Sequence, residues 1–524
     1  MLILASFVAW GAVFSLALGR RERRGWGFHG TVGMGVTLFV GGLLSLVHLV
    51  SVASIVAFLG LGVFAWGYLA ARLGETPRPI AWLRGLVDHK RWPLFFFGFV
   101  LVVFGVSVGL QYLGSVTFPT FNTWDDNMAY REFARQFLDT GTLRESFSYR
   151  RIATYGGQSY LQALVLALSD RDRLHLVDNG LCAVLMFGLA IGYRTSNAWA
   201  RRIAVLGGGL LAATLPHTPA NLGSELSGVV FFLAIFRLFD DEGFETADPR
   251  SNALLAGLLA AGVCTLRQNY LAPAVLLIGF VYGGLYLWPG ERTRRAWTGQ
   301  AVETFGAMVV FLLPWMLLAL VTVGTPLYPL IKGNLNPEFG ILGHITLAEE
   351  LRWSIENLFY QTRVIKAIYL MFAAVLVLPM TRRNRAAQAF FLCSALSFAV
   401  MMHFFRAFHD ANSISRYYLS FTVAFAIAGV QRALAGLGAD GRALRNALPA
   451  AAVAIFAILW QFTTTAETLH HRLTDDIDLT EQVLTHRGPA IPPLKIQDFY
   501  DRLQASVPEK APLLVMLDHT YLLN

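Results

Sequence analysis

Apolar residues fill long runs along most of the chain, and polar residues gather in short segments between the runs. The runs recur from residue 1 to residue 460. Many approach the roughly 20 residues that an α-helix needs to cross a bilayer. This alternation predicts an all-α polytopic membrane protein built as one large helical bundle rather than as several soluble domains.

Short clusters of Lys and Arg set the expected orientation, because such clusters concentrate in cytoplasmic loops. The clusters lie at residues 20–24, 72–91, 194–202, 292–295, 382–385 and 432–445. An even number of apolar runs separates consecutive clusters, provided that the acidic loop 240–248 lies on the same side. The pattern predicts about 14 spans in the plasma (inner) membrane, with both termini outside. The first run is followed, not preceded, by arginines, which indicates a reverse-oriented anchor rather than a cleaved signal peptide.

Composition agrees with a membrane protein. The chain is 55% hydrophobic and 15% charged, whereas soluble domains carry about 25% charged residues. The net charge of +8 does not indicate a nucleic-acid partner, because the cations lie in the loops between apolar runs. Cys182, Cys264 and Cys393 lie inside apolar runs without paired spacing. They are therefore expected to be core residues, not disulfide partners or metal ligands.

Two long segments are expected on the outer side, at residues 114–159 and 325–363. In the first, apolar residues recur at helical spacing between Met128 and Asp139, and Gly141 supplies a stop. In the second, Thr346 and Glu349 have the spacing of a capping box. Each segment is predicted to contain a short helix on the membrane surface.

The first outer segment carries two adjacent carboxylates, Asp125 and Asp126, ahead of its amphipathic run. Helix capping explains one of them, because Asp accepts backbone N–H bonds at a helix start. A second carboxylate, next to Trp124, is surplus to a cap. A helix start also keeps a carboxylate ionised, as a general base or a metal ligand requires. Both roles stay open, with Asp125 favoured for chemistry and Asp126 for the cap or a supporting contact.

A third acid, Glu225, lies in the next expected outer loop together with His217. An ionisable group at the entrance of a span is a functional candidate. The alternative is a surface glutamate near a helix start. His217 is one histidine without ligand spacing, which favours an ordinary loop residue.

Several cations are expected on the outer side, against the orientation rule, and they call for an anionic partner such as a lipid phosphate. The alternative is that each is an interface anchor whose charged end reaches the headgroups. Arg267 opens a tight turn that ends at Tyr270, and Tyr417 follows Arg416. The outer cations are Arg267, Lys332, Arg363, Lys366, Arg406 and Arg416.

Two glycine patterns have structural explanations. The run from Gly436 to Gly441 matches a dinucleotide-binding spacing, but it follows an apolar run and not a strand. The triplet Gly207, Gly208 and Gly209 favours close helix packing.

The first outer segment resembles the first outer loop of the GT-C glycosyltransferases. The similarity rests on Asp125 and Asp126, Tyr130, the amphipathic run and Gly141, and it is closest to the aminoarabinose transferases and the protein O-mannosyltransferases. Tyr155, followed by residues 156–160, lies where that family begins its next helix. The local match covers residues 124–166. The second acid is Asp where the family has Glu, and beyond the match the support is topological.

The resemblance implies an inverting glycosyltransferase that moves a sugar from a polyprenyl-phosphate donor to an outer glycolipid, polysaccharide or protein. Residues 1–464 would form its transmembrane catalytic domain, and residues 465–524 an extracytoplasmic tail with a buried strand at 512–517. A divalent cation such as Mg²⁺ or Mn²⁺, if used, would be held by Asp125 and Glu225. The implied catalytic residues are Asp125, Asp126 and Glu225; those for the donor phosphate are Arg267, Lys332, Arg406 and Arg416; those for substrate are Trp124, Tyr130, Tyr155, His217, Tyr270 and Tyr417.

Other functional classes remain alternatives. A flippase or transporter of lipid-linked glycans would have a similar number of spans, but it would place ionisable residues in mid-membrane and often contain inverted repeats. This chain concentrates its candidates in the outer segments and has no visible repeat. A non-catalytic partner in polysaccharide assembly is a third possibility.

Overall fold

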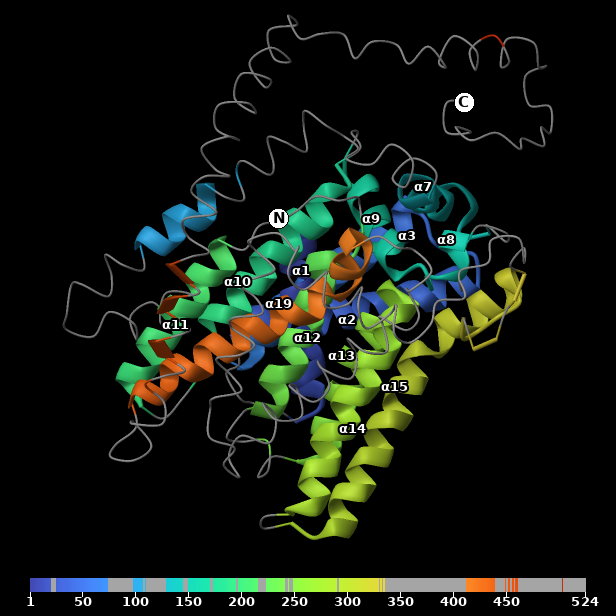
Figure 1. Cartoon of the computed structure of the whole chain (residues 1–524). Helices are drawn as coiled ribbons and strands as arrows, with labels where there is room; N and C mark the ends of the chain where they lie inside the picture. Colours follow the sequence, from blue (N-terminus) through green and yellow to red (C-terminus); the bar gives the residue numbers. More distant parts are fainter. Residues whose placement is uncertain are drawn as a thin grey trace, which may run out of the picture.

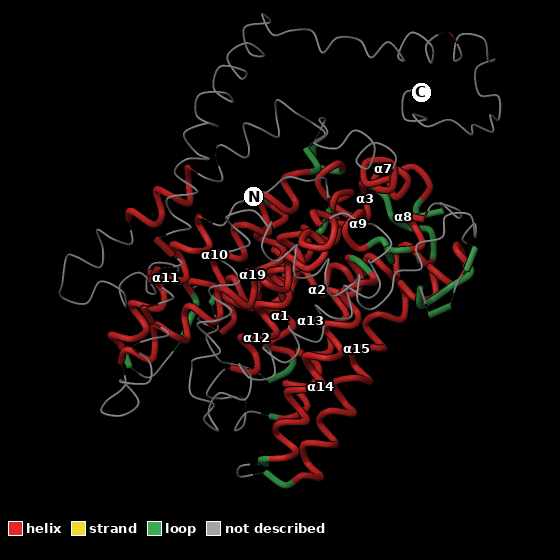
Figure 2. Tube along the Cα trace, in the orientation of Figure 1, coloured by secondary structure: helices red, strands yellow, loops and turns green. Residues whose placement is uncertain are grey.

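Every regular element in the described part of the chain is helical (Figures 1 and 2). The computed structural model describes residues 1–19, 25–73, 98–106, 109, 129–144, 149–169, 173–194, 197–214, 223–240, 244, 248–289, 292–328, 330–331, 333–334 and 411–438, with isolated residues beyond. Its longer helices are α1 (Leu2–Ala17), α2 (Trp26–Leu46), α3 (Val52–Leu73), α11 (Ala198–Thr214), α12 (Glu225–Asp240), α13 (Pro249–Leu266), α14 (Leu271–Leu287), α15 (Arg294–Val323) and α19 (Ala411–Ala435). Its shorter ones are α7 (Arg131–Thr140), α8 (Tyr149–Ile152), α9 (Gly157–Leu166), η2 (Leu176–Cys182), α10 (Ala183–Ile191), η3 (Gln268–Tyr270) and η6 (Gly436–Gly438).

Three helices in the described part of the chain are long and apolar enough to cross a membrane: Trp26–Leu46, Gln268–Leu287 and Arg294–Val323. α15 also keeps large apolar side chains on its surface, among them Val302, Val310 and Val321, which is 78% exposed. Such a surface is unfavourable in water and suits contact with lipid tails. The chain is therefore membrane-associated.

The direction of each helix follows from which residues meet. Tyr270, just after α13, donates to the carbonyl of Ser224, just before α12, so these two helices are antiparallel. α19 runs parallel to α12, because Ser420 contacts Glu225 and Arg432 contacts Asp240. We call the two extremities of the bundle the Glu225 end and the Arg237 end.

The segment that ends in α10 also runs parallel to α12. Asp178 of η2 bonds the first turn of α12, and the guanidinium of Arg237, in the last turn of α12, lies 4.5 Å from the ring centre of Tyr193. Parallel neighbours require that the chain between them return to the starting end. α11 supplies that return (Figure 1).

α9 begins at Gly157, where the family resemblance places a helix start, but it has only ten residues. Ten residues rise about 15 Å, half of a bilayer core. Gln158, in its first turn, contacts the carbonyl of Gly223. Leu166, its last residue, packs against the pair formed by Ala134 of α7 and Leu174. α9 therefore stays in the half of the bundle near the Glu225 end, and η2 with α10 leads to the other end.

The predicted amphipathic helix of the first outer segment is confirmed as α7. Phe133, Ala134 and Phe137 are buried, and Asp139 is exposed. The helix stops at Gly141, whose φ of 77° lies in the left-handed region that glycine adopts without strain. A side chain there would also collide with the carbonyl of His48.

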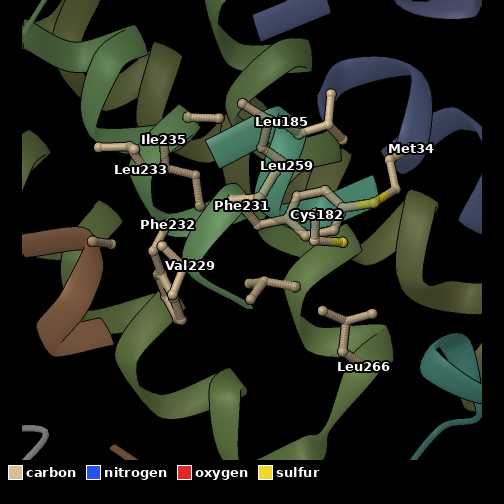
Figure 3. Packing of buried hydrophobic residues seen from close by; sticks show 14 of the residues in the cluster. Met34, Cys182, Leu185, Val229, Phe231, Phe232, Leu233, Ile235, Leu259 and Leu266 are labelled. Atoms are coloured by element: carbon tan, nitrogen blue, oxygen red, sulfur yellow. The ribbon is translucent and has the colours of Figure 1, made fainter. Parts of the chain in front are cut away.

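The core is an apolar interior shared by α2, α10, α12 and α13 (Figure 3). Phe231 and Phe232 of α12 are fully buried. The ring of Phe232 meets Tyr270 and Phe421 edge to face, with centroids 5.7 and 4.9 Å apart. Cys182 and Cys264 are buried free thiols, as expected. This packing fixes α12 and the turn at Tyr270 relative to each other.

The close-packing explanation of the Gly207–Gly209 triplet is confirmed where α11 meets α19. A Cβ added at Gly208 would lie 2.3 Å from the Gln431 side chain, and one at Gly207 would lie 2.2 Å from Leu434. The glycines let the two backbones approach closely, as in other membrane helix pairs. Gly436–Gly438 forms η6 directly after the helix α19, and not after a strand.

Candidate functional site

A cluster of buried and half-buried polar side chains lies at the Glu225 end. It draws on α9, η2, α12, η3 and α19, and on the residues just before α7, α12 and η3. Buried polar groups at helix ends require partners, so their bonds define the cluster. Its members, called here the polar cluster, are Tyr130, Gln158, Asp178, Ser224, Glu225, Ser227, Arg267, Tyr270 and Ser420.

Asp178 is the anchor of the polar cluster. Its carboxylate accepts from the backbone N–H of Leu226 at 2.6 Å and of Ser227 at 2.8 Å. These are donors of the first turn of α12, which no residue within that helix can satisfy. Arg267 attracts the same carboxylate electrostatically. Asp178 therefore caps a helix from 48 residues away in sequence.

Glu225 is the first residue of α12 and is only 8% exposed. The expected helix start is confirmed, but the alternative of a surface glutamate is wrong. Its backbone carbonyl accepts from Ser420 of α19 at 2.8 Å. Arg416 precedes Ser420 by one helical turn within α19. Glu225 is thus held where α12 and α19 meet.

Arg267 is 6% exposed and lies in the expected tight turn between two apolar helices. Its guanidinium Nη2 donates to the phenol oxygen of Tyr130 at 3.1 Å. The alternative of an interface anchor is wrong for this residue, because a snorkelling arginine keeps its charged end in contact with headgroups and water. The bond joins the first outer segment to the turn after α13.

Tyr270 is 2% exposed and is held by two bonds. Its hydroxyl donates to the carbonyl of Ser224 at 2.8 Å and lies 2.7 Å from the hydroxyl of Ser420. It therefore supports the helix junction directly, whatever part it plays toward a substrate.

Tyr155 lies in the link between α8 and α9. It is fully buried, and its hydroxyl donates to the carbonyl of Pro326 at 2.6 Å. Burial raises the pKa of this phenol above its ordinary value, so the group remains a donor at neutral pH. Nearby, Arg151 donates to the carbonyl of Thr154 and to the hydroxyl of Thr322 in α15. These bonds fasten the first outer segment to the end of α15.

The remaining candidates lie outside the described residues or side chains. Arg416 and Tyr417 belong to α19, but their side chains are not described. The predicted second surface helix and the predicted strand at 512–517 also lie outside the described residues. The same holds for the remaining residues singled out from the sequence: Trp124, Asp125, Asp126, His217, Lys332, Arg363, Lys366, Cys393 and Arg406.

Sequence reasoning missed Asp178, Gln158 and Arg151. Asp178 had a signal, since it is one carboxylate inside an otherwise apolar stretch that leads to Ile191. Gln158 had little sequence signal, because a glutamine near a helix start is common. It accepts from the hydroxyl of Ser227 at 2.9 Å and so links α9 to α12.

In the described part of the chain, no three His, Cys, Asp or Glu side chains converge. Asp178 already accepts two backbone bonds. The polar cluster contains one guanidinium, two carboxylates, two phenols, one amide and three serines. The guanidinium can pair with an anionic group, and the carboxylates, phenols and amide can bond hydroxyl groups.

No protein-family model matches the chain, and a comparison with curated proteins finds no significant match.

Proposed function

We propose that the chain is a GT-C-type membrane glycosyltransferase that uses a polyprenyl-phosphate-linked sugar. The observation that carries the proposal is the bond between Tyr130 and Arg267. It ties the segment that bears the acidic pair to a buried cation. Four steps of chain separate Asp126 from Tyr130, and such a length spans at most about 14 Å when extended. The chain length therefore allows the acidic pair to approach the cation, and the proposal takes both to bind the same donor.

The proposed reaction is an inverting displacement on the outer face of the membrane. Asp125 takes the proton of an acceptor hydroxyl or amine, and the acceptor atom bonds the anomeric carbon of the sugar. The bond from that carbon to the phosphate oxygen breaks, and the oxygen keeps the electron pair as part of a phosphate monoester dianion. Arg267 stabilises this added charge, together with Lys332, Arg406 and Arg416.

A carboxylate base with an ordinary pKa near 4 is weak at neutral pH, so positioning contributes much of the rate. Supports for such positioning include the anchored α7 and the bonds of Tyr155 and Arg151. Glu225, buried beside α19, is proposed to hold the acceptor or, if a divalent cation takes part, that cation together with Asp125. The acceptor would be a glycolipid, a polysaccharide or a protein.

The distribution of charge along α12 favours an enzyme over the alternative transporter. Ionisable residues occupy its two ends, at Glu225 and at Arg237 and Asp240, while residues 226–236 are uncharged. A transporter for a phosphorylated lipid would be expected to place charges near the middle.

The test uses the purified chain in lipid nanodiscs with polyprenyl phosphates that carry glucose, mannose, galactose or arabinose. An envelope extract serves as acceptor, and mass spectrometry follows the release of free polyprenyl phosphate. Wild type should consume at least one donor, and Asp125→Asn should lower that rate about 100-fold or more. Asp139→Asn, an exposed acid of the same segment, should match wild type.

Two results would count against the proposal. Wild-type rates in Asp125→Asn would remove that residue from catalysis. Failure to consume any donor, combined with movement of the same lipids across vesicle membranes, would favour the flippase.

A further inference from the structure

The turn after α13 contains two amide side chains with unsatisfied hydrogen-bonding atoms. Gln268 is 6% exposed, and both its Oε1 and its Nε2 are buried without a partner among the described residues. The Nδ2 of its neighbour Asn269 is in the same state. A buried polar atom without a partner costs about 1–3 kcal/mol. Three such atoms in consecutive residues form an expensive arrangement unless something binds them.

The backbone of the turn is held firmly, so local rearrangement does not readily satisfy these atoms. The N–H of Gln268 donates to the carbonyl of Ala153 at 3.2 Å, and the N–H of Tyr270 donates to the carbonyl of Arg267. The side chain of Tyr270 is bonded to Ser224 and Ser420. The amides are thus presented on a fixed support, as a binding group must be.

The chemistry of the amides indicates what they bind. A glutamine amide offers an acceptor oxygen and two N–H donors, and a sugar hydroxyl both donates and accepts. An uncharged amide binds a phosphate more weakly than a guanidinium does, so the phosphate is better bound by Arg267. In a polyprenyl-phosphate sugar, the ring hydroxyls lie next to the phosphate. In the turn, Gln268 and Asn269 follow Arg267 directly.

We propose that Gln268 and Asn269 form a hydroxyl-binding subsite for the sugar of the polyprenyl-phosphate donor, with Gln268 as its main residue. The inference rests on the proposed function. It adds that recognition of the sugar comes from the turn between α13 and α14, and it separates this task from phosphate binding by Arg267.

In the proposed subsite, Gln268 lowers the stability of the protein without donor and strengthens its binding of the sugar. A single substitution tests both effects. Gln268→Met has a similar volume but no hydrogen-bonding atoms that burial would leave unsatisfied. The variant should therefore unfold at a higher temperature than wild type when no donor is present. It should also bind the sugar-bearing lipid about tenfold more weakly. Binding of the same polyprenyl phosphate without a sugar should not change.

Gln431→Met is the matched control. Gln431 is fully buried in α19 at the Arg237 end, where its Oε1 accepts from Arg237 and its Nε2 donates to the carbonyls of Ala190 and Ala204. Removing a satisfied amide should lower the unfolding temperature and leave the binding of both lipids unchanged. The two buried glutamines are thus expected to respond with opposite signs in stability.

The measurements are thermal unfolding and lipid binding by native mass spectrometry in nanodiscs, with the four sugar-bearing lipids and the sugar-free polyprenyl phosphate. An unchanged preference for the sugar-bearing lipid in Gln268→Met would overturn the subsite. An equal loss for both lipids would also overturn it, because that result indicates a structural role. If the wild-type protein binds neither the sugar-bearing nor the sugar-free lipid, the proposed function itself fails. The result for Gln268→Met therefore separates failure of the subsite from failure of the proposed function.

Discussion

Single residues contribute most where the chain joins distant helices. Glu225, Arg267 and Tyr270 were predicted from sequence because each is polar at the edge of an apolar run, and the structure brings them together. Asp178 was not predicted, because its task depends on how helices 48 residues apart align. A sequence pattern therefore indicates whether a residue is buried more reliably than it indicates which residue it contacts. The acidic pair at Asp125 and Asp126 remains a prediction.

Replacing Asp178 by Ala should destabilise the protein strongly. The change removes two bonds to the start of α12 and leaves the buried Arg267 without the carboxylate that attracts it. The expected loss is about 2–4 kcal/mol, measured as unfolding of the purified protein in detergent. Asp139→Ala, at an exposed position of α7, should stay within about 0.5 kcal/mol of wild type. Equal stability of the two variants would show that Asp178 is not an anchor.

At the scale of elements, the sequence was a good guide to α7 and a poor one to α9. α7 combines a clear apolar face with a terminal Gly141, and both signals are local. α9 lies in an apolar run that looks like the start of a span. Its ten residues end where Leu166 meets α7 and where a charged segment, residues 170–173, follows. Its length is decided by packing and by that break, which periodicity alone does not reveal.

The junction of α11 and α19 gives a test at the same scale. Gly208→Ala should lower the unfolding temperature, because the added Cβ would lie 2.3 Å from Gln431. The side chain of Gln431 cannot easily move away, because its Nε2 also donates to the carbonyls of Ala190 and Ala204. The expected cost of overpacking is about 1–3 kcal/mol.

Gly279→Ala in α14 serves as the control, because nothing lies within 4 Å of the added atom. Helix propensity predicts no loss and a gain of up to about 1 kcal/mol there. A smaller effect at Gly208 than at Gly279 would contradict close packing between α11 and α19.

For the whole molecule, the described helices alternate in the manner that the basic clusters predict. α11, α13 and α15 all begin at the Arg237 end, as α2 does. The expected number of about 14 spans and the sidedness of the membrane remain predictions. Three of the described helices meet the length and composition of a span.

Cysteine labelling tests the orientation. Leu49→Cys, at a position 59% exposed near the Glu225 end, should react with a membrane-impermeant maleimide in intact cells. Ala296→Cys, at an exposed position in the first turn of α15, should react only after the membrane is opened. Parent protein without the added cysteine gives the background from the native thiols. The reverse pattern would place the polar cluster on the cytoplasmic side.

The parallel arrangement of α10 and α12 has an electrostatic consequence. Each helix carries a partial positive charge at its N-terminus, from aligned peptide dipoles. η2 with α10, α12 and α14 all begin at the Glu225 end, so three such partial charges converge on the polar cluster. They offset the cost of burying Asp178 and Glu225. The electrostatic potential at the polar cluster therefore arises partly from the peptide backbone. A count of lysines and arginines would not reveal that contribution.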